Sequence, residues 1–161
     1  MKNALLILCC LSFLLFNCEQ GQKNQQANLD LIEKYVESVE NLDYEVMTAL
    51  LDDSYMGYGP SINDSINKTN AIASWKNNVE YLYESIRYEK SRNATVLVDS
   101  GENQGDWVSN WAQLDIVYKS DQSKVTIWAN TIYQIKNGKI IKSYTFYNEA
   151  DALEQLGYTF Y

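Results

Sequence analysis

The second half of the chain is β-rich and restricts the fold more than any other feature. Apolar and polar residues alternate there in four segments separated by turn-forming sequence, at residues 87–98, 107–119, 125–136 and 139–147. Asn137-Gly138, between the last two segments, favours a type I′ hairpin because both residues tolerate positive φ. Long strands twist and curl, so these segments predict a strongly curved antiparallel meander.

Three helices are expected before the meander. Their expected caps are Asn28, Asp43 and Thr69. The second helix is expected to close at Asp52-Asp53, and residues 55–58 to form a short strand. The third helix carries an apolar stripe at helical spacing that runs from Ile72 to Ile86.

A short helix is expected to end the chain, capped by Asn148 and stopped by Gly157. Helices that precede a meander form an α+β layout. A curled sheet that closes over a layer of helices makes a cone, and the mouth of a cone is a natural pocket. The predicted fold is therefore a cone-shaped α+β domain, with three N-terminal helices packed against a curved antiparallel sheet and a short C-terminal helix.

Residues 1–18 have the pattern of an export signal. The apolar run at 4–16 is too short to span a bilayer, which takes about 20 apolar residues. Its end at Cys18 resembles the lipobox of bacterial lipoproteins, in which that cysteine is lipidated and becomes the mature N-terminus. An ordinary signal peptide cut further along is the alternative. The expected location is the bacterial cell envelope, with the lipid anchor as the protein's only attachment to a membrane.

The domain organisation follows from this leader. Residues 1–17 are expected to be the lipoprotein-type signal peptide, 18–27 the lipidated cysteine and a flexible Gln-rich tether, and 28–161 a single folded domain. The formal net charge is −8. An acidic domain repels phosphate backbones, so nucleic acid is not an expected partner.

The sequence contains no histidine, and its three cysteines all lie in the leader. The commonest general base and the commonest metal ligand are therefore missing. A zinc site would have to be built from carboxylates alone, which is unusual. We expect neither a metal nor a cofactor.

Several short motifs occur in a characteristic order, namely Leu50-Leu51-Asp52-Asp53, Gly57-Tyr58-Gly59-Pro60, Asn137-Gly138-Lys139-Ile140 and Leu153-Glu154-Gln155-Leu156-Gly157. In this order and spacing they resemble the nuclear transport factor 2-like superfamily, in the branch that includes SnoaL-like polyketide cyclases. The resemblance covers about residues 28–158 and implies the cone-shaped fold. Members of the superfamily include isomerases, cyclases, dehydratases and non-catalytic binding modules, so the resemblance implies fold more firmly than function.

Catalytic members of the superfamily use an Asp or His inside the cone. The resemblance places Asn148 where SnoaL-like chains often carry the acid, and an amide cannot abstract a proton. Three carboxylates remain as weaker catalytic candidates: Asp52, Asp53 and Asp115. Asp115 alternates with the less apolar residues of its strand and is expected to face outward, whereas Asp52 and Asp53 are more simply explained as a helix end.

Aromatic residues supply the candidate pocket and the candidate interface, since the chain has thirteen tyrosines and four tryptophans. The expected pocket residues are Tyr58, Trp75, Tyr133, Tyr144, Phe146 and Asn148. For Trp75 a plain core position is the alternative. The tryptophans Trp107, Trp111 and Trp128 share the outer face of the predicted sheet, which predicts a partner surface. In the superfamily that face resembles a dimer interface.

The leading hypothesis is an envelope-anchored, non-catalytic module that binds a small hydrophobic molecule or a protein partner through an aromatic-lined cone. The alternative is a cofactor-free isomerase, cyclase or dehydratase of SnoaL-like type that uses a displaced carboxylate. A third possibility is a structural homodimer whose cone is filled by its own side chains.

Overall fold

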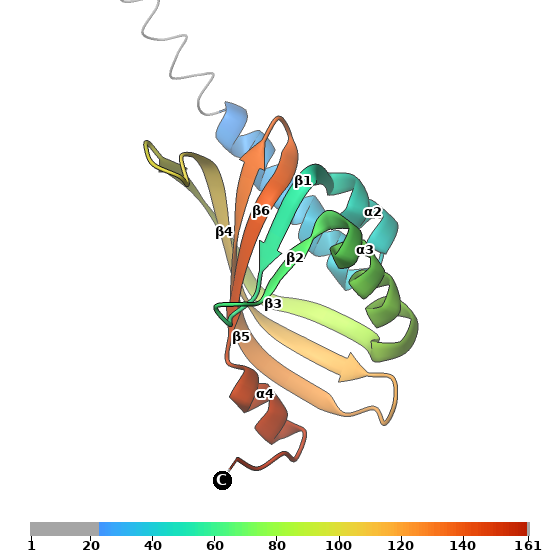
Figure 1. Ribbon diagram of the computed structural model, residues 1–161. Coiled ribbons are helices and arrows are strands. Elements are labelled where there is room, and N and C mark those ends of the chain that lie inside the picture. Colours follow the sequence, from blue (N-terminus) through green and yellow to red (C-terminus); the bar gives the residue numbers. More distant parts are fainter. Residues whose placement is uncertain (1–22, 161) are drawn as a thin grey trace, which may run out of the picture.

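The protein folds around one curved sheet of six strands in the computed structural model, which describes residues 23–160 (Figure 1). The strands lie in the order β2-β1-β6-β5-β4-β3. Their bounds are Leu51–Tyr58 (β1), Ser65–Asn67 (β2), Tyr83–Val98 (β3), Gly105–Tyr118 (β4), Lys124–Lys136 (β5) and Lys139–Tyr147 (β6). Helices cover one side of the sheet, as expected for an α+β domain.

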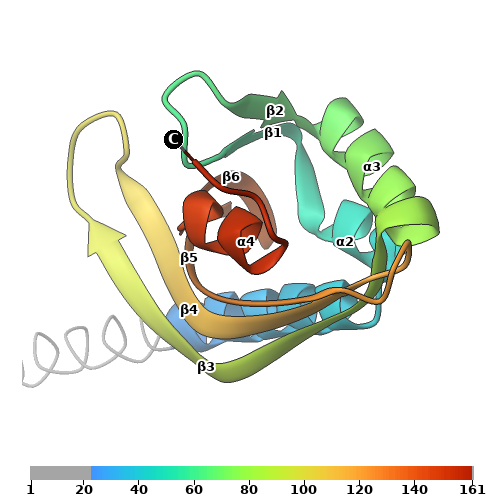
Figure 2. The ribbon, with the colours of Figure 1, turned by 90° about the horizontal axis from the view of Figure 1, so that it is seen from below.

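The helical layer comprises an N-terminal helix described over residues 23–40 and four shorter segments. These are α2 (Tyr44–Leu50), α3 (Lys68–Asn77), the π-helical turn η1 (Asn78–Leu82) and α4 (Glu149–Gln155). Seen from below in Figure 2, α4 lies in front of the opening that the curved sheet and the other helices surround, and in Figure 1 it lies at the lower end of the sheet. Within the described residues, no helix is both long enough and apolar enough to cross a membrane.

Strands β3 to β6 form the expected antiparallel meander, and each pairs with its neighbour in sequence. The sheet is nevertheless mixed, because β1 lies parallel to β6, with Tyr58 opposite Tyr144. The short strand β2 pairs with β1 and is not among the strands predicted from the sequence. The pairing of β1 with β6 joins segments far apart in the chain, and β2 has only three residues, so local periodicity encodes neither feature.

Strand β3 contains the irregularity that helps to curve the sheet. Its register with β4 shifts between Glu89 and Arg92, and Lys90 has a φ of 53°. Such a bulge bends a strand and increases its twist. Nearby, the backbone N–H of Tyr88 donates to Glu40 of the N-terminal helix at 2.8 Å, which ties the helix to the edge of the sheet.

The predicted hairpin turn and the predicted start and end of the C-terminal helix are confirmed. Asn137 and Gly138 have φ values of 53° and 70°, as a type I′ hairpin requires. The side chain of Asn148 accepts from the backbone of Asp151 and caps α4. Gly157, with a φ of 88°, lies in the turn that stops this helix.

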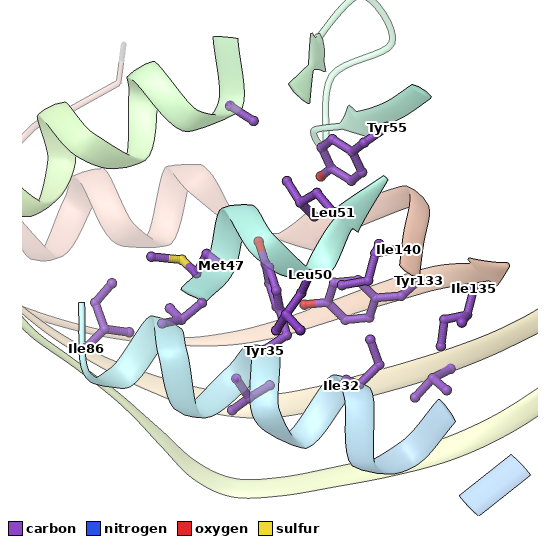
Figure 3. Packing of buried hydrophobic residues seen from close by; sticks show 14 of the residues in the cluster. Ile32, Tyr35, Met47, Leu50, Leu51, Tyr55, Ile86, Tyr133, Ile135 and Ile140 are labelled. Carbon is purple, nitrogen blue, oxygen red and sulfur yellow. The ribbon is translucent and has the colours of Figure 1, made fainter. Parts of the chain in front are cut away.

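The core lies between the N-terminal helix and the concave face of the sheet (Figure 3). Ile32 and Val39 of the helix are almost fully buried, as are Val108 of β4 and Ile140 of β6. Tyr35 meets Tyr133 of β5 edge to face, with ring centroids 5.6 Å apart. The apolar residues Ile32, Val36 and Val39, which recur at helical spacing, therefore face the sheet.

The predicted ends of all three N-terminal helices need correction. Residues 23–27, assigned to the tether, are already helical, in line with the helix-forming Gln, Lys and Ala of that segment. The second helix ends at Leu50, so Asp52 and Asp53 belong to β1. The third is capped by Asn67 and ends at Asn77, and Ile86 lies in β3, where pairing with β4 overrides the helical spacing of the stripe.

Candidate functional site

A cavity of about 340 Å³ occupies the cone between the sheet and the helices. It extends from the concave face of β4, β5 and β6 toward α4, whose Ala152 forms part of the wall at the mouth. Its aromatic residues are Tyr35, Tyr55, Trp75, Tyr83, Tyr88, Tyr118, Tyr133 and Tyr147. Its size is at the lower end of the range for small-molecule sites.

The tyrosines of the wall are held in their neutral form. Burial raises the pKa of Tyr35 and of Tyr133 well above the usual value, and the neighbouring phenol of Tyr55 adds to the rise of both pKa values. Burial also raises the pKa of Tyr83 to about 12. These side chains are therefore hydrogen-bonding phenols near neutral pH and not bases.

Tyr55 shows how the wall is built from distant segments. Its hydroxyl lies 2.7 Å from the hydroxyl of Ser143, joining β1 to β6. Burial raises the pKa of Tyr55, and the bond to Ser143 lowers it in part. Gly57, two residues further along β1, leaves room for this ring, because a Cβ there would lie 2.5 Å from the Tyr55 hydroxyl oxygen.

Among residues 23–160, no Asp, Glu, Lys or Arg side chain lines the cavity. Proton transfer near neutral pH needs a group whose pKa lies near the operating pH. A tyrosine with a raised pKa does not meet this condition. The cavity is suited to hold an uncharged molecule by apolar contact and hydrogen bonding.

Of the six expected pocket residues, two line the cavity and four do not. Trp75 and Tyr133 line the cavity. Tyr144 and Phe146 do not, because they lie on the convex face, where Tyr144 stacks on Tyr58 at a centroid distance of 4.8 Å. Asn148 is exposed and caps α4. The sequence pairs Tyr144 with Phe146 on one face correctly, but only the pairing with β5 decides that this face is convex.

None of the three candidate carboxylates lies in the cavity wall. Asp115 is on the convex face, as predicted, and accepts from Thr126 at 2.9 Å and from Gln113 at 3.1 Å. Asp53 is fully exposed and pairs with Lys68 at 2.8 Å. Asp52 accepts from the Ser54 hydroxyl and backbone, and these bonds lower its pKa. A base that takes a proton from a bound ligand is not found among them.

The three outer tryptophans differ in exposure. Trp111 and Trp128 are 42% and 59% exposed, whereas Trp107 is only 6% exposed. The indole of Trp107 donates to the backbone oxygen of Asn103, and its ring packs beside Tyr144 at 6.2 Å. The surface available to a partner is therefore built from Trp111 and Trp128, and Trp107 is part of its support.

Sequence reasoning missed most of the cavity wall, including Tyr35, Tyr55 and Tyr88. A partial signal existed, since Tyr35 follows Ile32 at helical spacing and Tyr55 precedes the small residue Gly57 by two positions. The expected lipidation site, Cys18, lies outside the described residues. In the part of the chain that is described, no group of three or more potential metal-ligating side chains comes together.

Known structures share this architecture at low sequence identity. A protein proposed to be a polyketide cyclase, from Xanthomonas campestris, aligns with a TM-score of 0.68 and 13% identity over 83% of this chain and 98% of its own. An NTF2-like protein of unknown function from Burkholderia pseudomallei gives 0.60 and 12%, over 82% and 98%. An LEH-like epoxide hydrolase from M. tuberculosis gives 0.60 and 11%, over 83% and 91%. The chain has the nuclear transport factor 2-like fold.

No protein-family profile matches the sequence, and no curated protein matches it either. The NTF2-like fold is thus evident in the structure and not in overall sequence similarity. Structures with this fold bear names as different as cyclase and epoxide hydrolase. Function therefore has to be argued from the residues of the cavity.

Proposed function

We propose that this protein is a non-catalytic binding module that holds a small, uncharged, mainly hydrophobic molecule in the cone. The observation that carries the proposal is a cavity of about 340 Å³ whose walls, within residues 23–160, contain apolar and neutral polar side chains and no ionised group. An ionised ligand would lose its hydration there without gaining a counter-charge, which costs several kcal/mol or more. An apolar ligand gains free energy in proportion to the surface that it buries.

Native mass spectrometry of the protein purified from bacterial cells tests this proposal. We expect a bound small molecule as extra mass that disappears when the protein is denatured. A matched variant, Ala129→Trp, fills the cavity from β5 and is expected to carry no extra mass. Extra mass that persists in Ala129→Trp would place the ligand elsewhere and contradict the proposal.

The alternative function is that of an enzyme. Its only support is that proteins with the same fold include ones proposed to be cyclases. It requires turnover of the bound molecule. Incubating the released molecule with fresh protein and following its mass distinguishes the two functions. A new product, lost in a Tyr133→Phe variant, would favour an enzyme, whereas an unchanged molecule supports a binding module.

We also propose that the module is attached to a membrane of the bacterial envelope through lipid on Cys18. The support is the leader pattern and the cysteine that ends it. In phase separation with a mild detergent, the native protein is expected in the detergent phase and Cys18→Ser in the aqueous phase. Equal partitioning of the two would argue for an ordinary cleaved signal peptide.

A further inference from the structure

A band of neutral polar side chains crosses the floor of the cavity. Asn110 of β4 lies opposite Thr131 of β5, which in turn lies opposite Thr145 of β6. All three residues line the cavity. They interrupt faces that are otherwise mainly apolar, so three strands place polar groups side by side in one row.

The hydrogen bonds within the band leave groups over for a ligand. The hydroxyls of Thr131 and Thr145 lie 3.1 Å apart, and that contact uses one of their two protons. Both amide protons of Asn110 are occupied, by Ser91 at 2.8 Å and Asn93 at 2.9 Å. The carbonyl oxygen Oδ1 is therefore the group of Asn110 that remains to accept a hydrogen bond.

Phenol and serine hydroxyls extend the band. Burial raises the pKa of Tyr133, and the neighbouring Thr131 side chain lowers that pKa in part. Ser143, two residues before Thr145, holds the hydroxyl of Tyr55 at 2.7 Å. Among the described residues, every fully buried side-chain nitrogen or oxygen has a partner. The buried polar atoms of the band are thus satisfied within the fold, and the residues of the band line the cavity, where their remaining hydrogen-bonding groups can meet a ligand.

The band also has a defined position along the cone. On β4, Asn110 is the cavity residue furthest from the mouth, and Leu114 and Ile116 follow toward it. On β5, Val125 and Ile127 line the mouth side and precede Thr131. The row of hydroxyl and amide side chains therefore lies at the deep end of the cavity, and the part toward α4 is lined by Leu114, Ile116, Val125 and Ile127 and by the rings of Tyr118 and Tyr147.

We infer that the deep end of the cavity recognises an uncharged oxygen-bearing group, a carbonyl or a hydroxyl, on a molecule whose apolar body lies toward the mouth. This inference rests on the proposed binding function and adds the ligand's chemical class and its orientation. A hydroxyl on the ligand donates to Asn110 Oδ1, and a carbonyl accepts from a threonine hydroxyl. A pure hydrocarbon leaves the band without these bonds.

Three bicyclic probes of similar size test the inference by calorimetric titration of the purified protein: tetralin, 1-tetralone and the carboxylate 1,2,3,4-tetrahydro-1-naphthoate. We expect 1-tetralone to bind about threefold to tenfold more tightly than tetralin, the effect of one net hydrogen bond. The carboxylate is expected to bind most weakly because its charge is not compensated.

Isosteric variants locate the effect. In Thr131→Val the preference for 1-tetralone over tetralin is expected to disappear while tetralin binding is kept. Thr126→Val makes the same change on the convex face of β5 and is expected to leave the preference intact. If Thr131→Val does not fold, as judged by circular dichroism, Thr145→Val replaces it.

The outcomes separate this inference from the proposed function. Equal binding of 1-tetralone and tetralin, or an unchanged preference in the folded threonine variant, overturns the role of the band and leaves the binding function standing. Tightest binding of the carboxylate overturns the uncharged ligand class. Failure of all three probes to bind overturns the proposed function itself, and the inference with it.

Discussion

At the scale of single residues, the protein is distinguished by buried phenols. Tyr35, Tyr83, Tyr88 and Tyr133 surround one cavity, and burial raises the pKa of each. A phenol keeps its hydrogen-bonding hydroxyl while contributing apolar ring surface. The same residues thus build the core and form a wall that can hold a ligand.

These phenols predict unfolding in alkaline solution. An unfolded tyrosine loses its proton near pH 10, whereas Tyr83 keeps it up to about pH 12 in the folded protein. In this window the unfolded chain binds fewer protons, so the free energy of unfolding falls as pH rises, by about 1.4 kcal/mol per pH unit for each such tyrosine. Urea unfolding at pH 9, 10 and 11 measures the slope.

The variant Tyr35→Phe tests whether buried tyrosines cause the alkaline unfolding, and Tyr158→Phe is its control. Tyr35→Phe removes one buried titrating group. The fall in the free energy of unfolding per pH unit is therefore expected to be smaller by the contribution of one tyrosine. Tyr158→Phe removes an exposed tyrosine and is expected to leave the slope unchanged. A slope that Tyr35→Phe does not alter would show that this phenol is accessible to hydroxide in the folded protein.

Gly57 is expected to be intolerant of a side chain. A Cβ there would lie 2.5 Å from the Tyr55 hydroxyl and 3.1 Å from Ile66 of β2. Gly57→Ala is therefore expected to lower the free energy of unfolding by about 1–3 kcal/mol, the usual cost of overpacking. Chemical denaturation measures it, and a double-mutant cycle with Tyr55→Phe should show that Gly57→Ala costs less once the hydroxyl is gone.

At the scale of elements, the short helix α4 is held by a side chain that takes the place of a strand. Strand β6 pairs with β5 from Ala129 onward, so the start of β5 lacks this neighbour. Gln155 occupies the position: its Oε1 accepts from the Thr126 N–H and its Nε2 donates to the Thr126 carbonyl, both at 2.9 Å. These two hydrogen bonds hold α4 across the mouth of the cone, although the helix has no buried residue of its own.

Gln155→Ala is expected to release α4 from the sheet. The loss of two hydrogen bonds should lower the free energy of unfolding by about 1–2 kcal/mol, and exchange of the Thr126 amide should accelerate about tenfold or more. Hydrogen exchange measured by NMR checks both the position and the size of the effect. Glu154→Ala, an exposed neighbour on the same helix, is the control and should change neither quantity.

At the scale of the whole molecule, the convex face is the largest feature that the cavity does not explain. Trp111, Trp128 and Phe146 are each at least 42% exposed there. The ammonium group of Lys90 lies over the Trp128 ring, 5.6 Å from its centroid. Exposed aromatic side chains with a positively charged side chain beside them are typical of protein interfaces.

We propose that two copies of the chain associate through this face. Light scattering during gel filtration is expected to give a dimer mass, and Trp128→Lys, which sets a second cation beside Lys90, is expected to give a monomer. Tyr81→Lys changes an exposed aromatic residue in η1 and should remain dimeric. A monomeric wild-type protein would leave the convex face to a different partner.

Local sequence patterns determined the order of the helices and of the strands other than β2, the hairpin at Asn137-Gly138, the cap at Asn148 and the inward face of β4. They determined these because periodicity, capping and turn preferences act over a few neighbouring residues. The absence of histidine, and of cysteine after Cys18, likewise limits the chemistry that the folded domain can perform, because composition does not depend on the fold.

Only the tertiary structure decided which segments meet. It placed β1 parallel to β6, turned Tyr144 and Phe146 to the convex face and brought Asn110, Thr131 and Thr145 into one row. On β4 one set of alternating side chains is clearly the more apolar, but on β6 the alternation separates two sets without showing which one is enclosed. That choice depends on the register with neighbouring strands and on the helices that cover one side, and both arise from contacts between residues far apart in the chain.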